Sequence, residues 1–480
     1  MDHYRVCVVG AGTAGLGVVK QLLRDENIPI SDIILLDEST GVGGVWNGVD
    51  RDIDHVNVGM DCSGNPIYDD LHTNLPKDFM SFSDFRYPIE SNHFPSHRAV
   101  LKYLQTYSQT FIPDHCIQLN TSVKDIQKTN DHWTVKCCIN GELSANRVQS
   151  FTTEYVVVCT GHYRYPFVPF FKESARANSR IHSMHSSAFR HPSAFTSYRN
   201  ILVVGSRASA KDVCMLLLKH CQSNALGQNI YMAVRGGMEN MILSRRAFVL
   251  PVMKQGGHVR GEVQYIDHQA GEVTFSSAVD SPQPTLPPDY VKESIDLIIY
   301  ATGYLYKYPF LAEDQHSGPS MVRERPLLHR VVSLADPTLM FVGTLNFLLS
   351  PGIVLEYQAR YVAQLISGKI QLPRDFTSLL NKFVVANVTS SRGVFKEKDA
   401  GSQKCILVDQ ESVELAEFDM SSSLMFSSPT YCNKLARLTN SQGFWSQLFQ
   451  QRLWWTVTSL LYQFTCSISP RFRDWLRRNA

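Results

Sequence analysis

Residues 4–9, near the start of the chain, read as a short strand with an apolar run over 6–9, and a segment of helical periodicity follows after a glycine-rich turn. From residue 13 to about residue 26, apolar side chains recur three or four positions apart, as on one buried face of a helix: Leu16, Val19, Leu22 and Leu23. A second apolar run, 32–37, comes next and ends in an acid. The order strand, helix, strand predicts a βαβ unit and an α/β fold with a parallel sheet.

The same pattern recurs near the middle of the chain. An apolar run over residues 200–204 leads into Gly205, and positions of helical spacing follow at Val213, Leu216, Leu217 and His220. A further apolar strand, 229–234, ends in Arg235. Two strand-turn-helix units predict two bound nucleotides, because each unit can present a turn and a helix N-terminus to phosphates.

The first turn has the spacing Gly-x-Gly-x-x-Gly, and each glycine meets a different need. The first allows the tight turn, the second lets a pyrophosphate approach the backbone, and the third lets the helix pack on its strand. An acid follows about 20 residues later, where a carboxylate binds the ribose hydroxyls. The alternative is a tight turn that binds nothing. The predicted dinucleotide site consists of Gly10, Ala11, Gly12, Thr13, Ala14, Gly15 and Asp37.

The second turn departs from this spacing, with Arg207 at the middle glycine and Ala210 at the last. Alanine is an accepted residue at the last position. Arg207 either obstructs a pyrophosphate or donates hydrogen bonds to it from its guanidinium. Arg235 ends the strand that meets the adenosine ribose, which favours a 2′-phosphate and hence NADPH over NADH. Otherwise Arg235 is a solvated charge.

Composition narrows the function classes. The chain has 480 residues, 44% of them hydrophobic, which suffices for two or three domains with buried cores. A formal net charge of +2 gives no global field for nucleic acid or an acidic partner. Eleven cysteines without a Cys-x-x-Cys pair predict reduced thiols, with neither a disulfide framework nor a metal site. No charged-then-apolar leader precedes the first strand, so we expect a cytoplasmic protein.

Three further motifs carry a resemblance to a known family. Gly-Gly-x-Trp occupies residues 43–46, Thr-Asn-Leu-Pro-Lys occupies 73–77, and Ala-Thr-Gly-Tyr occupies 301–304. With the first glycine turn, they resemble the flavin-containing monooxygenases over about residues 4–375. The resemblance implies that FAD binds the first turn, with Gly44, Val45 and Trp46 near the flavin. The family more often has Glu where this chain has Asp37, and either carboxylate can bind a ribose.

The resemblance also implies roles for single residues. Asn74, between Thr73 and Leu75, would lie beside the flavin and steady its peroxide; the alternative is that Asn74 caps the turn before Pro76. The NADPH site would comprise Gly205, Ser209, Ala210, Lys211, Asp212 and Arg235.

A signature that the family carries at the start of the inserted domain is only half present. His185, Phe189 and Arg190 match it, whereas Ser179 and Ile181 stand where the family has Phe and Gly. The Phe-Arg ending favours flavin-containing monooxygenases over the related Baeyer–Villiger monooxygenases, which carry Trp at this place.

The implied fold has two Rossmann-like, doubly wound nucleotide-binding domains, with the NADPH domain inserted into the FAD domain. The FAD domain would comprise residues 1–165 and 296–375, with the strand that begins at 296 closing it, and the NADPH domain residues 166–295. Residues 376–443 form a polar region without a predicted fold. Residues 444–480 form an amphipathic, basic tail, which either lies on a membrane, such as the cytosolic face of the endoplasmic reticulum, or packs on the protein.

As a reaction, the resemblance implies that NADPH reduces FAD and that O₂ then forms a C4a-hydroperoxyflavin. This species would oxygenate a soft nucleophilic nitrogen or sulfur atom of a small molecule, with no nucleic acid partner. Three alternatives remain open. Arg207, Ser179 and Ile181 suggest an FAD-binding regulatory protein without turnover; a Baeyer–Villiger enzyme would act on ketones; and a disulfide reductase would need a redox cysteine pair at the flavin.

Overall fold

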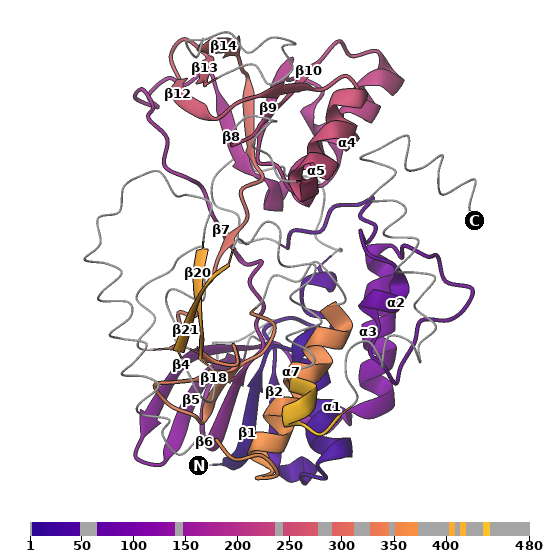
Figure 1. The fold of residues 1–480 in the computed structure, drawn as a ribbon, viewed down its shortest axis with the longest axis vertical. Helices are drawn as coiled ribbons and strands as arrows, with labels where there is room; N and C mark the ends of the chain where they lie inside the picture. The colour runs from indigo at the N-terminus through magenta and orange to yellow at the C-terminus, as the bar shows by residue number, and fades with distance from the viewer. Residues whose placement is uncertain are drawn as a thin grey trace. The chain divides into compact units, whose positions relative to one another are not determined.

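The structure, a computed structural model, describes residues 2–48, 65–139, 147–235, 243–276, 290–311, 327–344, 351–372, 403–408, 413–418 and 435–441. These residues form two compact units (Figure 1). The first unit takes its residues from 1–48, 71–162 and 306–456, and the second unit takes its residues from 49–70 and 163–305. The second unit is therefore inserted into the chain of the first.

The sheet of the first unit is built around β1 (His3–Val9), which pairs in parallel with β2 (Ile33–Leu36) and β6 (Arg147–Val158). The strand order is β17-β18-β19-β6-β1-β2-β3, and two antiparallel strands, β4 (Thr121–Thr129) and β5 (His132–Ile139), extend from β6. Val6 to Val9 of β1 and the whole of β2 are buried apolar runs, because both faces of a parallel sheet are covered. The remaining strands are β3 (Ile117–Gln118), β17 (Leu327–Leu328), β18 (Val332–Ser333) and β19 (Leu339–Phe341).

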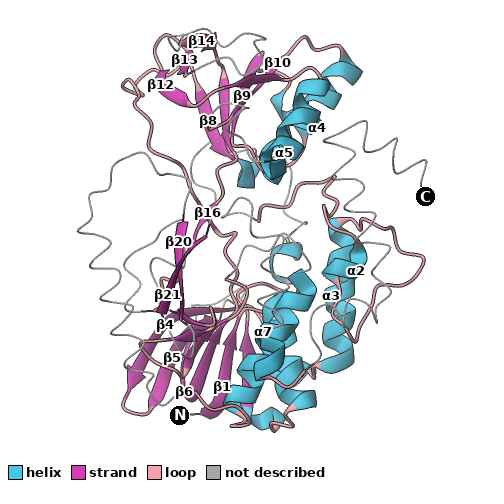
Figure 2. Ribbon diagram, viewed as in Figure 1, coloured by secondary structure: helices cyan, strands magenta, loops and turns pink. Residues whose placement is uncertain are grey.

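Helices cover this sheet (Figure 2). α1 (Thr13–Lys20) continues as a π-helical turn, Gln21–Asp25, so the helix predicted over residues 13–26 is confirmed, with a change of winding in its last turns. α3 (His97–Phe111) and α7 (Pro351–Ile366) also pack here, and α2 (Lys77–Met80) is a single turn. α7 is buried along nearly its whole length, which agrees with its predominantly apolar sequence.

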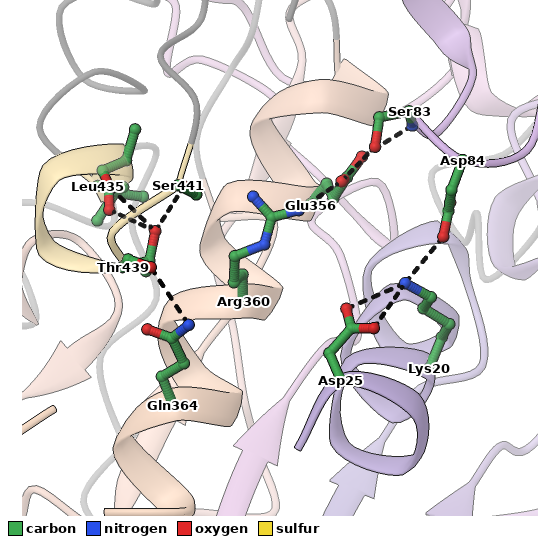
Figure 3. A network of polar contacts seen from close by, with 11 residues as sticks. Lys20, Asp25, Ser83, Asp84, Glu356, Arg360, Gln364, Leu435, Thr439 and Ser441 are labelled. Atoms are coloured by element: carbon green, nitrogen blue, oxygen red, sulfur yellow. Dashed lines mark hydrogen bonds and ion pairs between the residues drawn. The ribbon is translucent and has the colours of Figure 1, made fainter. Parts of the chain in front are cut away.

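Two charged side chains in the interior of the first unit tie its elements together (Figure 3). Glu356 of α7 accepts hydrogen bonds from the backbone N–H of Ser83 at 2.8 Å and from its hydroxyl at 2.5 Å, and it pairs with Arg360 at 2.8 Å. Lys20 of α1 pairs with Asp84 at 2.8 Å. Buried charges need such partners, because an unpaired charge is strongly destabilising. Residues 83 and 84 are thereby held to both α7 and α1.

The second unit contains a parallel sheet of order β11-β10-β9-β15-β8. Its strands are β8 (His182–His185), β9 (Asn200–Val204), β10 (Asn229–Ala233), β11 (His258–Arg260) and β15 (Leu297–Tyr300), and its helices are α4 (Ala208–Asn224) and α5 (Leu243–Lys254). Three antiparallel strands complete the unit: β12 (Val263–Asp267), β13 (Glu272–Phe275) and β14 (Val291–Ser294). The two nucleotide-binding folds predicted from the sequence are thus present.

The strand β15 lies in the second unit, although the sequence predicted it in the first. The sequence predicted that the strand beginning at 296 closes the first sheet, but β15 lies between β9 and β8 in the second sheet. That expectation is wrong. Asp296 accepts hydrogen bonds from the backbone N–H groups of Arg199 and Asn200, which places the following residues beside β9. The chain returns to the first unit at Tyr306, after β16 (Tyr304–Leu305) has paired with β7 (Tyr165–Pro166).

The region 376–443, for which no fold was predicted, contains an antiparallel pair, β20 (Gln403–Val408) and β21 (Val413–Phe418). Farther along, Leu435 and Ala436 are buried, and the backbone carbonyl of Thr439 accepts a hydrogen bond from Gln364 of α7. The tail at 444–480 lies outside the described residues. Within the described part of the chain, no helix is both long and apolar enough to cross a membrane.

Candidate nucleotide sites

The turn after β1 requires glycine at two positions for steric reasons. Gly10 has φ +107°, and a Cβ there would lie 2.6 Å from the carbonyl oxygen of Cys159. A Cβ on Gly15 would lie 1.9 Å from the carbonyl oxygen of Gly10, a distance that no packing adjustment of side chains can relieve. The backbone therefore turns sharply at Gly10, and α1 packs directly on that turn.

Gly12 brings a distant loop to the same place. A Cβ on Gly12 would lie 3.4 Å from the Cα of Gly44, and a Cβ on Gly44 would lie 2.8 Å from the Cα of Gly12. The Gly43 N–H also donates to the carbonyl of Ala11 at 2.9 Å. The turn Gly44–Trp46, which includes Val45, therefore lies against the N-terminus of α1. Two of the segments predicted to bind FAD are thus in contact through backbone that carries no side chains.

Asp37 lies beside this turn. Its carboxylate accepts hydrogen bonds from the backbone N–H of Ala11 at 2.6 Å and from that of Ser39 at 2.8 Å, one on each oxygen. An ionised carboxylate can accept about four hydrogen bonds, so each oxygen keeps room for a ribose hydroxyl. The two backbone bonds fix the orientation of the carboxylate.

The N-terminus of α1 is left open for an anion. Its N-cap, Gly12, has no side chain to bond the first N–H groups, and its first turn, which includes Thr13 and Ala14, holds no acidic residue. α4, whose N-cap is Arg207, likewise has no side-chain cap bond and no acidic residue in its first turn. By contrast, Ser96 caps α3 by accepting from Ala99 N–H at 3.4 Å. The unpaired N–H groups and the positive dipole end suit a pyrophosphate, so the first turn fits FAD and the second fits a further nucleotide.

Asn74 lies in a segment whose backbone is held on both sides. Thr73 donates its N–H to the carbonyl of Pro95 at 2.9 Å and its hydroxyl to the carbonyl of Leu75 at 2.7 Å. Asn74 itself is exposed, and its amide has no hydrogen-bond partner among the described residues. The N-cap of α2 is Pro76 without a side-chain bond, so Asn74 does not act as a helix cap. Its amide is available to a ligand.

The second turn, after β9, is also held by a glycine. Gly205 has φ +143°, and a Cβ there would lie 2.4 Å from the carbonyl oxygen of Ala301. Arg207 has extended backbone, with φ −115° and ψ −169°, and an exposed side chain. Any residue adopts that conformation, so Arg207 fits this turn without strain. Ala210 is fully buried in the unit's core, and Ser209 is exposed in the first turn of α4.

Asp212 is already engaged within the protein. One carboxylate oxygen pairs with Lys211 Nζ at 2.9 Å, and the other accepts a hydrogen bond from the Tyr68 hydroxyl at 3.1 Å. Burial and the neighbouring Asp212 carboxylate raise the pKa of Tyr68, so the hydroxyl keeps its proton. Sequence reasoning missed Tyr68. It lies five residues before Thr73, and a tyrosine before an Asn-Leu-Pro motif carries no signal for a partner 144 residues away.

Arg235 follows β10 and is 59% exposed. Among the described residues, the carboxylate of Glu262, which is 51% exposed, lies 3.9 Å from the Arg235 Nε. Such an exposed ion pair contributes little to the stability of the protein. The guanidinium is therefore available for a phosphate at the end of this strand.

The half-matched signature forms part of the core of the second unit. His185 is fully buried; its Nδ1 accepts from the Ser187 N–H at 3.1 Å, and its Nε2 donates to the Gly303 carbonyl at 3.0 Å. Burial lowers the pKa of His185 to about 4, so the ring is neutral. Ser179, at the family's Phe position, accepts from the Ile181 N–H at 3.0 Å and bonds His268 at 3.0 Å. A local polar cluster thus stands where the signature is missing.

Comparison with known proteins shows which family the chain resembles. It matches the profile of the family described as flavin-binding monooxygenase-like over residues 3–246 and 272–429. It is 27% identical over 379 residues to the flavin-containing monooxygenase FMO GS-OX1 of Arabidopsis thaliana, covering 77% of this chain and 75% of that protein. It is 26% identical over 377 residues to the senecionine N-oxygenase of Tyria jacobaeae, covering 77% and 73%.

The fold agrees with this match. The S-allyl-L-cysteine S-oxygenase from Allium sativum superposes with a TM-score of 0.65 at 21% identity, covering 92% of this chain and 90% of that chain. The predicted fold class, two doubly wound nucleotide-binding units with one inserted into the other, is confirmed. The chain therefore belongs to the flavin-binding monooxygenase-like family, and it is a flavin-dependent monooxygenase whose cofactors are FAD and NADPH.

Proposed function

We propose that this enzyme uses NADPH to oxygenate a soft nucleophilic nitrogen or sulfur atom of a small molecule. The observation that carries the proposal is Asn74, an exposed amide without a partner among the described residues, on backbone that is fixed on both sides. The matched proteins include one named an N-oxygenase and one named an S-oxygenase, so both atoms are candidates for this chain.

The residues divide the work between the two units. The first unit would bind FAD through the turn at Gly10 to Gly15, with Asp37 on the ribose and Gly44 beside the pyrophosphate. Bound FAD, once reduced, supplies the activation of O₂. Asn74 would donate a hydrogen bond where negative charge develops on oxygen, which is most effective in a site that excludes water. The second unit would bind NADPH at Gly205 and α4, with Arg235 on the 2′-phosphate.

The experiment is an aerobic turnover assay of the purified, FAD-loaded protein with NADPH and a panel of tertiary amines and thioethers. We expect NADPH oxidation together with products heavier by one oxygen atom, detected by mass spectrometry. A protein that binds FAD but consumes no NADPH in air would instead be a regulatory protein. Oxygenation of cyclic ketones in preference to amines and thioethers would indicate a Baeyer–Villiger enzyme.

We also propose that residues 444–480 contact a membrane surface, such as the cytosolic face of the endoplasmic reticulum. Residues 444–464 carry an apolar stripe with tryptophans, and four arginines follow between 471 and 478. Such a segment suits the boundary between lipid headgroups and acyl chains, and the arginines suit anionic lipid.

A further inference from the structure

Residues 65–70 belong to the second unit, although the residues that follow them directly belong to the first. The side chain of Tyr68 contacts two elements of the second unit. Its hydroxyl donates to Asp212 in α4 at 3.1 Å, and its ring packs edge-on against Phe189 with ring centroids 6.1 Å apart. Phe189 is fully buried. The backbone N–H of Asp69 also donates to the carbonyl of Arg190 at 3.2 Å. We call residues 67–69 the Tyr68 strap.

The chain changes units immediately after the Tyr68 strap. The carbonyl of Leu71 accepts from the N–H of His97 at 3.0 Å, and the Thr73 N–H donates to Pro95 at 2.9 Å, both within the first unit. Asp70 is thus the single residue between backbone anchored in the second unit and backbone anchored in the first. One residue spans only about 3.5 Å, so this connection has little slack.

Lys211 connects the strap to the nucleotide site. Its ammonium lies 2.9 Å from one oxygen of Asp212, while Tyr68 holds the other. Lys211 is also in the first turn of α4, where phosphate would bind. A phosphate competes with Asp212 for the Lys211 ammonium. When Lys211 turns to phosphate, Asp212 loses its cation and depends more strongly on the Tyr68 hydroxyl.

We infer that Tyr68 and Asp212 are positioning residues that link NADPH binding at α4 to the placement of Asn74. The inference rests on the proposed function. A bound nucleotide strengthens the Tyr68–Asp212 hydrogen bond and holds the Tyr68 strap more firmly. The strap, through Asp70, then restrains the backbone that presents Asn74. By reciprocity, the restrained strap favours nucleotide binding.

Hydrogen exchange tests this linkage without turnover. The exchange of peptide 65–74 is measured by mass spectrometry in the FAD-loaded protein, with and without saturating NADP⁺. We expect NADP⁺ to slow exchange of this peptide by about threefold or more, since the local opening becomes less favourable. In Tyr68→Phe this slowing should disappear. Tyr265→Phe, a partly exposed tyrosine of β12, is the matched control and should respond as the parent does.

Lys211→Gln tests the linkage with Tyr68 intact. Because the competing ammonium is absent, exchange of the Tyr68 strap in this variant should already be slow without nucleotide, and saturating NADP⁺ should change it little. Fast exchange in nucleotide-free Lys211→Gln, equal to that of the parent, overturns the inference. This arm also stands if Tyr68→Phe fails to fold, which its thermal unfolding temperature and FAD content reveal.

A coupling assay tests the effect on Asn74. Tyr68→Phe should raise the fraction of NADPH oxidation that releases hydrogen peroxide severalfold, and adding it to Asn74→Ala should cause no further rise, because both changes act through one residue. Additive effects, or a Tyr68→Phe variant coupled like the parent, overturn the inference alone. A parent protein that does not bind NADP⁺ overturns the proposed NADPH function, and this inference with it.

Discussion

At the scale of single residues, Gly12 and Gly44 show how two backbone segments approach closely where neither carries a side chain. A β-carbon on Gly12 would contact Gly44 at 3.4 Å, an ordinary van der Waals distance, whereas one on Gly15 would meet a carbonyl oxygen at 1.9 Å. Gly12, the second glycine of the turn, is therefore needed for what binds the turn, whereas Gly15, the third, is needed for the turn itself.

This difference gives opposite expectations for two alanine substitutions. Gly12→Ala should leave the unfolding temperature of the flavin-free protein within a few degrees of the parent and weaken FAD binding, and Gly12→Val should abolish FAD binding. Gly15→Ala should destabilise the flavin-free protein by roughly 3 kcal/mol or more, since overpacking against backbone cannot relax. Flavin fluorescence titration and thermal unfolding measure both. Equal unfolding temperatures for the Gly12→Ala and Gly15→Ala variants would refute this assignment.

Asn74 should matter for chemistry and not for assembly. Asn74→Ala should retain FAD and consume NADPH, with the electrons leaving as hydrogen peroxide, because the amide donor to oxygen is lost. Asn74→Asp, of the same shape but without an N–H donor, is the matched control and should behave like Asn74→Ala. Peroxide and oxygenated product are quantified per NADPH. Coupling equal to that of the parent in both variants would remove Asn74 from the reaction.

Arg235 should discriminate between the two nicotinamide nucleotides. Arg235→Ala should raise the KM for NADPH by about 10- to 100-fold, the range expected for hydrogen bonds to a charged group, and leave the KM for NADH little changed. Glu262→Gln removes the nearby carboxylate and should not weaken NADPH binding. Steady-state kinetics with both nucleotides decide, and an equal loss for NADPH and NADH would assign Arg235 a structural role.

At the scale of elements, His185 joins the ends of β8 and β15 by donating to Gly303. The pKa of His185 falls from 6.5 to about 4 through burial, which corresponds to about 3 kcal/mol. The unfolded chain therefore binds more protons than the folded chain between pH 4 and 6.5. The contribution of His185 to stability is full above about pH 6.5 and is lost as the pH falls toward 4.

The expected result is a fall in the unfolding temperature over that interval that is steeper in the parent than in His185→Gln. Glutamine can keep the bond to Gly303 but does not titrate. His3→Gln, at an exposed histidine, should follow the parent. The measurement is thermal unfolding from pH 4 to 7.5, and parallel curves for the parent and His185→Gln would contradict the expectation.

Sequence reasoning predicted elements better than their partners. Both strand-turn-helix units follow from hydrophobic period and glycine spacing, and the structure confirms them. The sheet that contains β15 could not be predicted in this way, because a strand buried on both faces fits the interior of any parallel sheet. The contact of Tyr68 with Asp212 could not be predicted either, because a single hydrogen bond between distant residues produces no repeating pattern in the sequence. The residues proposed to bind nucleotides stay predictions, and they rest on a spacing that matches the shape of a pyrophosphate site.

At the scale of the whole molecule, the tail after residue 443 is the part whose role a simple deletion can test. Truncation after Gly443 should shift the protein from membrane to soluble fractions and remove binding to vesicles that contain anionic lipid, because the Trp-bearing stripe and the arginines are lost together. Vesicle sedimentation, with neutral vesicles as the control, measures this. The same distribution before and after truncation would show that the tail packs on the protein.

The pairing of β7 with β16 has a consequence for how such a chain folds and arose. The strands through which the chain enters and leaves the second unit are neighbours, with Tyr165 opposite Leu305. Paired residues of antiparallel strands lie about 5 Å apart. The first unit must bring together the two chain ends that flank segment 163–305. The entropy cost of doing so is then set by this short separation and not by the length of the segment. Segment 163–305 should therefore cost the first unit about as much closure entropy as a short hairpin would.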